Sequence, residues 1–169
     1  MNNNYWSYCL YPLFLSTLSS CTLASFTDQE LQDELDHLAL RAVARFKFPK
    51  VDLSFAYDSE EENPNYSIVK RKSKGYYFLN DVSIKEIRVI ISWMKVYWLE
   101  YQLSKERNYE NLYADKDVKA FSSGNLINSI EKAYNTFTTA ARKDEEDYSR
   151  VNAKGKPAIG DVNVDIWFV

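Results

Sequence analysis

The middle of the sequence reads SIKEIRVIISWMKVYWLEYQLSK over residues 83–105. Its apolar residues recur at alternating spacings of three and four, which is the period of a helix with a continuous apolar face. They are Ile84, Ile87, Ile91, Met94, Trp98 and Tyr101, and Ile90 and Tyr97 widen that face. Ser83 and Glu86 form a capping box at the start. The spacing therefore predicts a helix over residues 84–105 that is packed on more than one side and is central to the fold.

Two further helices are predicted, one on each side of this stretch. The first covers residues 28–46, where Thr27 and Glu30 form a capping box and Pro49 excludes helical geometry beyond it. Its apolar stripe is Leu31, Leu35, Leu38, Ala42 and Phe46. The other begins near Ser123 and runs to about Asp147, with a stripe of Ile127, Ile130, Tyr134, Phe137 and Ala141. The sequence thus predicts a mainly α fold, a bundle of three long helices with terminal arms.

A small antiparallel β insertion is predicted at residues 51–79. Apolar and polar residues alternate over 51–57, and two more strand patterns follow at 66–69 and 76–79. An acidic run and a basic run lie between these strands, and both are predicted loops. The basic run precedes Gly75 at the hairpin tip and offers candidate contacts to DNA or an acidic partner, although a solvated turn is the more ordinary interpretation. These candidates are Lys70, Arg71, Lys72 and Lys74.

The N-terminal segment, residues 1–26, has no charged residue, and the first charge is Asp28. Its first 14 residues contain the aromatic residues Tyr5, Trp6, Tyr8, Tyr11 and Phe14. One interpretation is an arm that contacts a neighbouring subunit, because a single chain has difficulty covering so many aromatic side chains. The alternative is a segment folded back onto its own core. Both interpretations stay open.

Export is a third interpretation of the same segment. The apolar run over residues 8–18 has the length of a signal-peptide core, and Leu18-Ser19-Ser20-Cys21 resembles a bacterial lipobox. No Lys or Arg precedes the run, however, and Pro12 interrupts it. A secreted or lipid-anchored protein is therefore the alternative to an assembly subunit.

The C-terminal segment, residues 149–169, changes character. Gly and Pro residues break the helix pattern, and Val162, Val164, Ile166 and Phe168 then alternate with polar residues and Trp167. The pattern predicts a terminal strand that pairs with this chain's own sheet or with a neighbour's. We therefore take Ile166, Trp167 and Phe168 as candidate intersubunit contacts.

Composition bounds the function. The chain has 169 residues, one domain's length, with a body at 27–148. The net charge of −3 argues against a surface that coats nucleic acid, and one His and two Cys leave few groups for metal binding or acid–base catalysis. Gly155-Lys156 lacks the spacing of a phosphate loop, and no G-x-S-x-G is present. We expect no enzyme, catalytic residue, cofactor or metal site.

Six fragments carry a resemblance to a known family. They are FTDQELQDEL and RAVARFKFP, YYFLNDVSIKEI and WMKVYWLE, and YSRVN and GKPAIGDVN. Over residues 27–160 the chain resembles the head-to-tail connector proteins of tailed bacteriophages, also called adaptor or neck ring proteins, including those of crAss-like and other podovirus-like phages. The uncharged N-terminal segment departs from the compact members.

The resemblance implies a structural virion protein of the neck region, assembled in the host cytoplasm. Its partners would be other copies of itself in a cyclic ring, the portal protein and other neck or tail proteins. DNA would pass through the ring with transient, non-specific contact, and no membrane would be involved.

Overall fold

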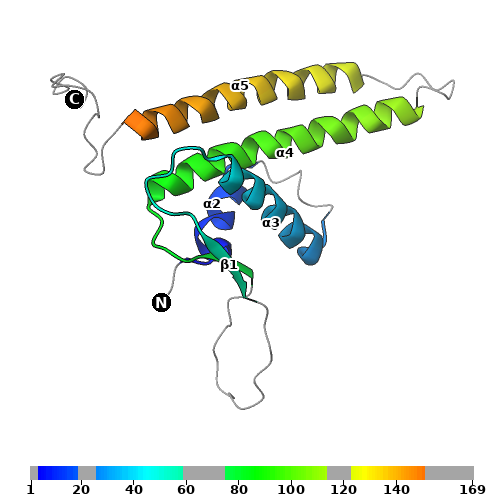
Figure 1. Ribbon diagram of the computed structural model, residues 1–169. Helices are drawn as coiled ribbons and strands as arrows, with labels where there is room; N and C mark the ends of the chain where they lie inside the picture. The colour runs from blue at the N-terminus through cyan, green and yellow to red at the C-terminus, as the bar shows by residue number, and fades with distance from the viewer. Residues whose placement is uncertain (1–3, 19–25, 59–74, 114–122, 151–169) are drawn as a thin grey trace, which may run out of the picture.

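The computed structural model describes residues 4–18, 26–58, 75–113 and 123–150. These residues are mainly helical, with one two-stranded antiparallel sheet, which confirms the predicted fold class (Figure 1). In chain order the elements are α1 (Trp6–Cys9), α2 (Tyr11–Leu15), α3 (Asp28–Arg45), β1 (Phe55–Asp58), β2 (Gly75–Phe78), α4 (Ile84–Tyr113) and α5 (Ser123–Arg150).

Helix α4 is central, as its wide apolar face predicts. It packs against α3 on one side and against α5 on another, and α5 runs antiparallel along it (Figure 1). Ile87, Ile90 and Met94 are buried in the core, and Val89, Trp93 and Val96 are buried as well. The helix continues to Tyr113 rather than ending at residue 105. Arg107 of this extension pairs with Glu131 of α5, so the longer helix is supported by its neighbour.

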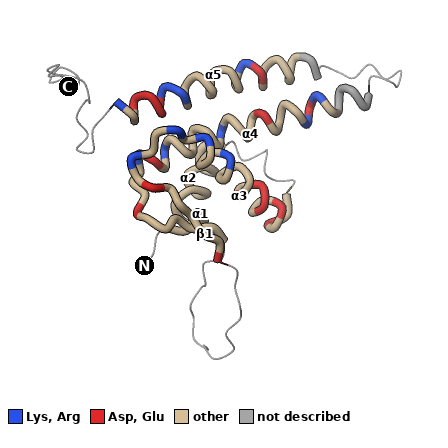
Figure 2. Tube along the Cα trace, viewed as in Figure 1, with Lys and Arg blue, Asp and Glu red and all other residues tan. Residues whose placement is uncertain are grey.

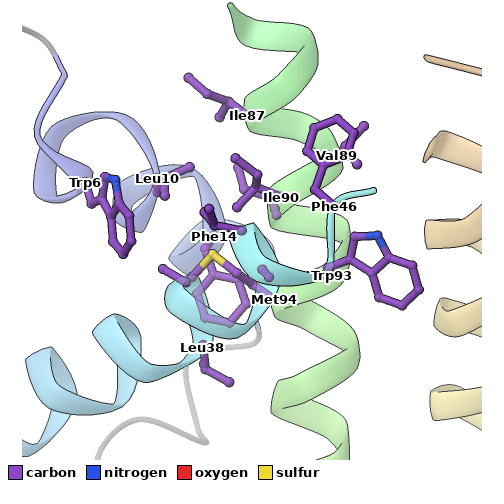
Figure 3. Close-up of a cluster of buried hydrophobic side chains, with 14 of the residues drawn as sticks. Trp6, Leu10, Phe14, Leu38, Phe46, Ile87, Val89, Ile90, Trp93 and Met94 are labelled. Carbon is purple, nitrogen blue, oxygen red and sulfur yellow. The ribbon is translucent and has the colours of Figure 1, made fainter. Parts of the chain in front are cut away.

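The core lies where α1, α2, α3 and α4 meet. Trp6, Leu10 and Phe14 of the N-terminal segment are fully buried there. Figure 3 shows Leu10 and Phe14 near Ile90 and Met94 of α4, whereas the Trp6 ring packs against aromatic side chains of the sheet. Burying a side chain of this size contributes about 1.5–3 kcal/mol, so the N-terminal segment supplies a large share of the core.

Helix α3 begins and ends as the sequence predicts. The Thr27 hydroxyl accepts a hydrogen bond from the Glu30 amide, and the Glu30 carboxylate accepts one from the Thr27 amide at 2.8 Å, so the capping box is confirmed. Figure 2 shows acidic residues toward the first turns of α3 and basic residues toward its end, which complements the helix dipole. His37 is exposed on its polar face.

Cation–π contacts join α3 to α4. The Arg41 guanidinium lies 4.0 Å from the centre of the Tyr97 ring, and that of Arg45 lies 4.5 Å from the Trp93 ring. Arg41 also donates to the Glu100 carboxylate at 2.6 Å. Each cation–π contact is worth about 0.5–2 kcal/mol, depending on its desolvation, so these arginines fix the position of α3 along α4.

The small sheet lies beside the N-terminal segment. β1 and β2 pair in antiparallel register, with Phe55 opposite Phe78 and Asp58 opposite Gly75. Gly75 has φ of 113°, a conformation that favours glycine. The Phe78 amide donates to the Asn4 carbonyl at 3.0 Å, so the N-terminal segment covers the outer edge of β2.

The first strand is shorter than predicted. It begins at Phe55 because Asp52 accepts hydrogen bonds from the amide and the hydroxyl of Ser54, a local turn that precedes the strand. The alternation over residues 51–57 is typical of a half-buried strand with Phe55 and Tyr57 on its apolar face, but these two side chains are 38% and 51% exposed. The strand predicted at 66–69 lies outside the described residues.

Candidate interaction surfaces

The N-terminal aromatic residues occupy two different environments. Trp6, Tyr11 and Phe14 are at most 4% exposed within the chain itself. The Trp6 ring lies against Tyr76 at 5.0 Å and against Phe55 and Phe78. The expectation that a single chain does not cover these three side chains is therefore corrected: residues 4–18 fold back onto the body.

Tyr5 and Tyr8 lie at the surface of the same segment. The Tyr5 hydroxyl donates to the Asp58 carboxylate at 2.8 Å. The backbone of Tyr5 also forms an isolated antiparallel β-bridge with Tyr77, at the edge of the sheet. Tyr8 is 55% exposed, and its ring meets Tyr5 edge-on. Contact with a neighbouring subunit stays a prediction for these two residues.

A partly buried hydrogen bond ties the N-terminal segment to α3. The Tyr11 hydroxyl donates to the Asp36 carboxylate, which also accepts from the Gln32 amide at 3.1 Å. Burial and this hydrogen bond raise the pKa of Tyr11, and burial raises that of Asp36. The Asp36 carboxylate therefore fixes the N-terminal segment and is not free for acid–base chemistry.

A polar junction, formed by Glu86, Glu145 and Tyr148, joins three parts of the chain. The Tyr148 hydroxyl of α5 donates to the Glu86 carboxylate of α4 and accepts from the Lys50 amide at 2.9 Å. The Glu145 carboxylate accepts from the Lys47 amide at 2.7 Å. All three side chains of the junction are at most 7% exposed. The junction therefore holds the connection after α3 against both long helices.

The contacts within the junction shift the pKa values of Glu86 and Tyr148. Burial alone would raise the pKa of Glu86, but hydrogen bonds from the Ser83 and Tyr148 hydroxyls and from backbone amides outweigh it and lower the pKa. Burial and the hydrogen bond to Glu86 raise the pKa of Tyr148 to about 12. At neutral pH the pair is a phenol that donates to a carboxylate, which is the charge state that its geometry requires.

The raised pKa of Tyr148 predicts how the free energy of unfolding changes at alkaline pH. Because the pKa of Tyr148 is raised in the folded state, its contribution to stability is complete below about pH 10, the pKa of an unfolded tyrosine, and is lost as the pH rises toward about 12. We expect the free energy of unfolding to fall more steeply between pH 10 and 12 in the wild type than in Tyr148→Phe. Urea titrations at several pH values measure both slopes, and equal slopes would contradict the assignment.

An apolar groove runs between α4 and α5. It has a volume of about 390 Å³ and is lined mainly by side chains of these two helices, with Thr17 and Leu18 below them. The α4 side contributes Lys95, Trp98, Leu99, Gln102 and Glu106, and the α5 side contributes Leu126, Ile130 and Phe137. Leu126 and Phe137 are 49% and 41% exposed. The groove is therefore an apolar surface that the described residues leave open.

The groove corrects the predicted packing of α5. Ile127 and Ala141 are buried, and Ile130 and Tyr134 are half-buried, but Phe137 is exposed although its spacing placed it on the core-facing stripe. The reason is geometric: α5 packs mainly on α4, and a single helix covers less than the full width of an apolar stripe. Leu126 lies four residues before Ile130 and one before Ile127, so a stripe that begins at Ile127 omits it.

The described residues offer few side chains for metal binding or nucleophilic catalysis. No group of three or more His, Cys, Asp or Glu residues is placed there to hold a metal ion. Burial raises the pKa of the Cys9 thiol to about 11, so this thiol is protonated at neutral pH and is a poor nucleophile. Among the described helices, none combines the length and the apolarity needed to cross a membrane.

The remaining candidates from the sequence lie outside the described residues. These are the basic residues Lys70, Arg71, Lys72 and Lys74 and the C-terminal residues Ile166, Trp167 and Phe168. Their contacts with DNA, the portal or a neighbouring subunit stay predictions.

Comparison with known proteins gave no match: no protein-family model, no curated protein and no solved structure is detectably similar to this chain. The functional argument therefore depends on the groove, the polar junction and the buried N-terminal segment.

Proposed function

We propose that the chain is a non-enzymatic structural subunit of the ring between the portal and the tail of a tailed phage, a head-to-tail connector through which DNA passes. The observation that carries the proposal is the open apolar groove between α4 and α5. Within the described residues, Leu126 and Phe137 are partly exposed on this one surface, and apolar exposure gathered in one place is typical of an interaction site. A subunit of an assembly can use such a surface to contact its neighbours.

The shape of the chain suits a cyclic ring. Each subunit of a ring presents one surface to the preceding copy and a different surface to the next. The groove is one such surface, and the exposed Tyr8 of the N-terminal segment marks another part of the molecule that is open to a partner. The two surfaces differ in composition and position, which favours head-to-tail contact over a twofold dimer.

The buried polar groups support a structural role rather than an enzymatic one. Glu86 and Tyr148 bond to each other, and Glu145 bonds to a backbone amide. An acid–base catalyst needs a group that reaches its substrate and exchanges a proton with it. These three groups instead hold neighbouring segments together.

Export is less well supported than assembly. Processing at Cys21 would remove residues 1–20, and with them Trp6, Leu10 and Phe14, which are fully buried in the core. A cleaved signal peptide is by contrast no part of the mature fold. The burial of these residues therefore favours their retention in the functional protein.

A slightly acidic subunit is compatible with a DNA channel. Attraction between protein and DNA phosphates arises mainly from Lys and Arg contacts, and few such contacts let DNA slide. The net charge of −3 gives no overall attraction to DNA, so any attraction has to come from local groups of Lys and Arg. We propose that Lys70, Arg71, Lys72 and Lys74 supply the transient contacts with DNA or with a partner ring.

The proposal is tested by mass photometry and electron microscopy of the full chain, alone and mixed with the portal protein encoded in the same genome. We expect closed rings, or ring-bearing complexes when the portal is present. A chain that stays monomeric and does not associate with the portal at micromolar concentration would contradict the proposal. A portal or terminase gene beside the coding gene is the matching genomic expectation.

A further inference from the structure

We propose that the groove between α4 and α5 binds residues 165–169 of a neighbouring copy, with Ile166, Trp167 and Phe168 seated on Leu99, Leu126 and Phe137. This inference rests on the proposed ring and names the contact that closes it. It also replaces the sheet-edge pairing that the strand pattern of this segment suggests with a groove on the long helices.

The groove has the size and the chemistry of a peptide site. Its volume of about 390 Å³ lies within the range of roughly 300–1,000 Å³ that is typical of binding pockets. Trp98 is only 4% exposed and forms part of its lining, while Leu126 and Phe137 on the α5 side are much more exposed. An incoming apolar side chain would thus gain contacts on two sides.

The occupant follows from the composition of the chain outside the described residues. Residues 166–169 read IWFV, the longest wholly apolar run that includes both Trp and Phe in the segment after α5. Trp and Phe each bury about 150–250 Å² when covered, so leaving both in water is costly. The run supplies the two aromatic anchors that an apolar groove of this kind requires.

Lys95 offers a charged partner for Asp165 of the occupant. Lys95 lies at one end of the groove, with its ammonium 6.0 Å from the centre of the Phe137 ring, and Glu106 lies at the other. These two residues are about 16 Å apart along α4 at ~1.5 Å per residue. A strand-like segment from Asp165 to Val169 spans about 13 Å at ~3.3 Å per residue. With Asp165 beside Lys95, the apolar run covers the groove toward Glu106.

The proposed ring makes a neighbour the donor, because the linking segment is long enough to reach the groove of either chain. Arg150, the last residue of α5, lies about 20 Å beyond the level of Phe137 along the helix, at ~1.5 Å per residue. Residues 151–164 can span about 46 Å at ~3.3 Å each, which is enough to reach a groove on an adjacent subunit. A cyclic ring needs contacts between unlike surfaces of adjacent subunits. Insertion into the same chain would fill the groove without making such a contact.

The test uses the full chain with the photoreactive residue p-benzoylphenylalanine at position 167, prepared with and without ¹⁵N labelling and mixed before irradiation. We expect mixed-label cross-links from position 167 to peptides that contain Trp98–Glu106 or Leu126–Phe137. Cross-links confined to a single label would show insertion into the same chain, and cross-links to β1 would show sheet pairing. Either result would overturn the proposal.

A matched pair of variants tests the groove itself. Leu126→Asp places a charge on the α5 side of the groove, and Asn128→Asp places the same charge on an exposed site two residues away. We expect Leu126→Asp to reduce the mixed-label cross-link at least tenfold and Asn128→Asp to retain it, with both variants equally helical by circular dichroism. Equal cross-linking in the two variants would count against the groove as the receptor.

The failure of this inference is distinguishable from failure of the proposed function. Rings that bind the portal, but whose cross-links map elsewhere, would overturn the groove contact and leave the connector role intact. Mixed-label cross-links into the groove from a chain that ignores the portal would support the contact and overturn the connector role.

Discussion

Replacing Trp6 by alanine is expected to lower the free energy of unfolding by about 3–5 kcal/mol, the usual cost of removing a large aromatic side chain from a core. Trp6 is 0% exposed and lies between Phe55, Tyr76 and Phe78. A domain of this size has a total stability of about 5–15 kcal/mol, so the variant should be close to unfolded at physiological temperature. Urea denaturation followed by tryptophan fluorescence and circular dichroism measures the change.

Two matched variants separate packing from other effects. Tyr8→Ala removes a neighbouring aromatic side chain that is 55% exposed, and we expect a change within about 0.5 kcal/mol. Trp6→Phe keeps an aromatic ring in the core and removes the Trp6 indole N–H, which is buried and has no hydrogen-bond partner among the described residues. It should therefore be less destabilising than Trp6→Ala. If Trp6→Ala matched Tyr8→Ala in stability, the buried position of Trp6 would be wrong.

Tyr148→Phe is expected to lower the free energy of unfolding by about 1–3 kcal/mol, although it removes a single oxygen atom. The Tyr148 hydroxyl donates to Glu86 and accepts from the Lys50 amide. Glu86 is only 4% exposed, so its carboxylate would lose a donor in a place where little water replaces it. Denaturation in urea at neutral pH provides the value.

The same experiment has a control on the same helix. Tyr134 of α5 is half-buried and lies outside the polar junction, so Tyr134→Phe is expected to change stability by less than about 0.5 kcal/mol. A double-mutant cycle with Glu86→Gln isolates the pair itself, because residues in direct contact give non-additive effects. Additive losses in that cycle would show that the hydroxyl and the carboxylate do not interact.

The helices were predictable because their signals are local. The capping box at Thr27 and Glu30 sets the start of α3, and the three–four spacing from Ile87 to Trp98 sets the buried face of α4. Both depend on residues within a few positions of one another. The pairing of β1 with β2 was likewise expected from alternation, apart from the start of the first strand.

The interaction surfaces were less predictable because they depend on distant contacts. Glu86 and Tyr148 are 62 positions apart, and each alone reads as an ordinary helix residue. The sequence offered no means to decide whether the N-terminal aromatic residues cover this chain or a neighbour, since both arrangements bury Trp6 and Phe14. The exposure of Phe137 follows from the number of helices that pack on α5, which periodicity does not report.

The polar junction has a consequence for how the chain folds during synthesis. Lys47 and Lys50 bond to residues of α5 that are translated 98 positions later. At about 5–20 residues per second, the ribosome needs about 5–20 s to supply those partners. During that interval the face of α4 that α5 will cover lacks its partner helix. The newly made chain is thus most vulnerable to aggregation late in its synthesis, and conditions that slow elongation past residue 123 should reduce the soluble yield.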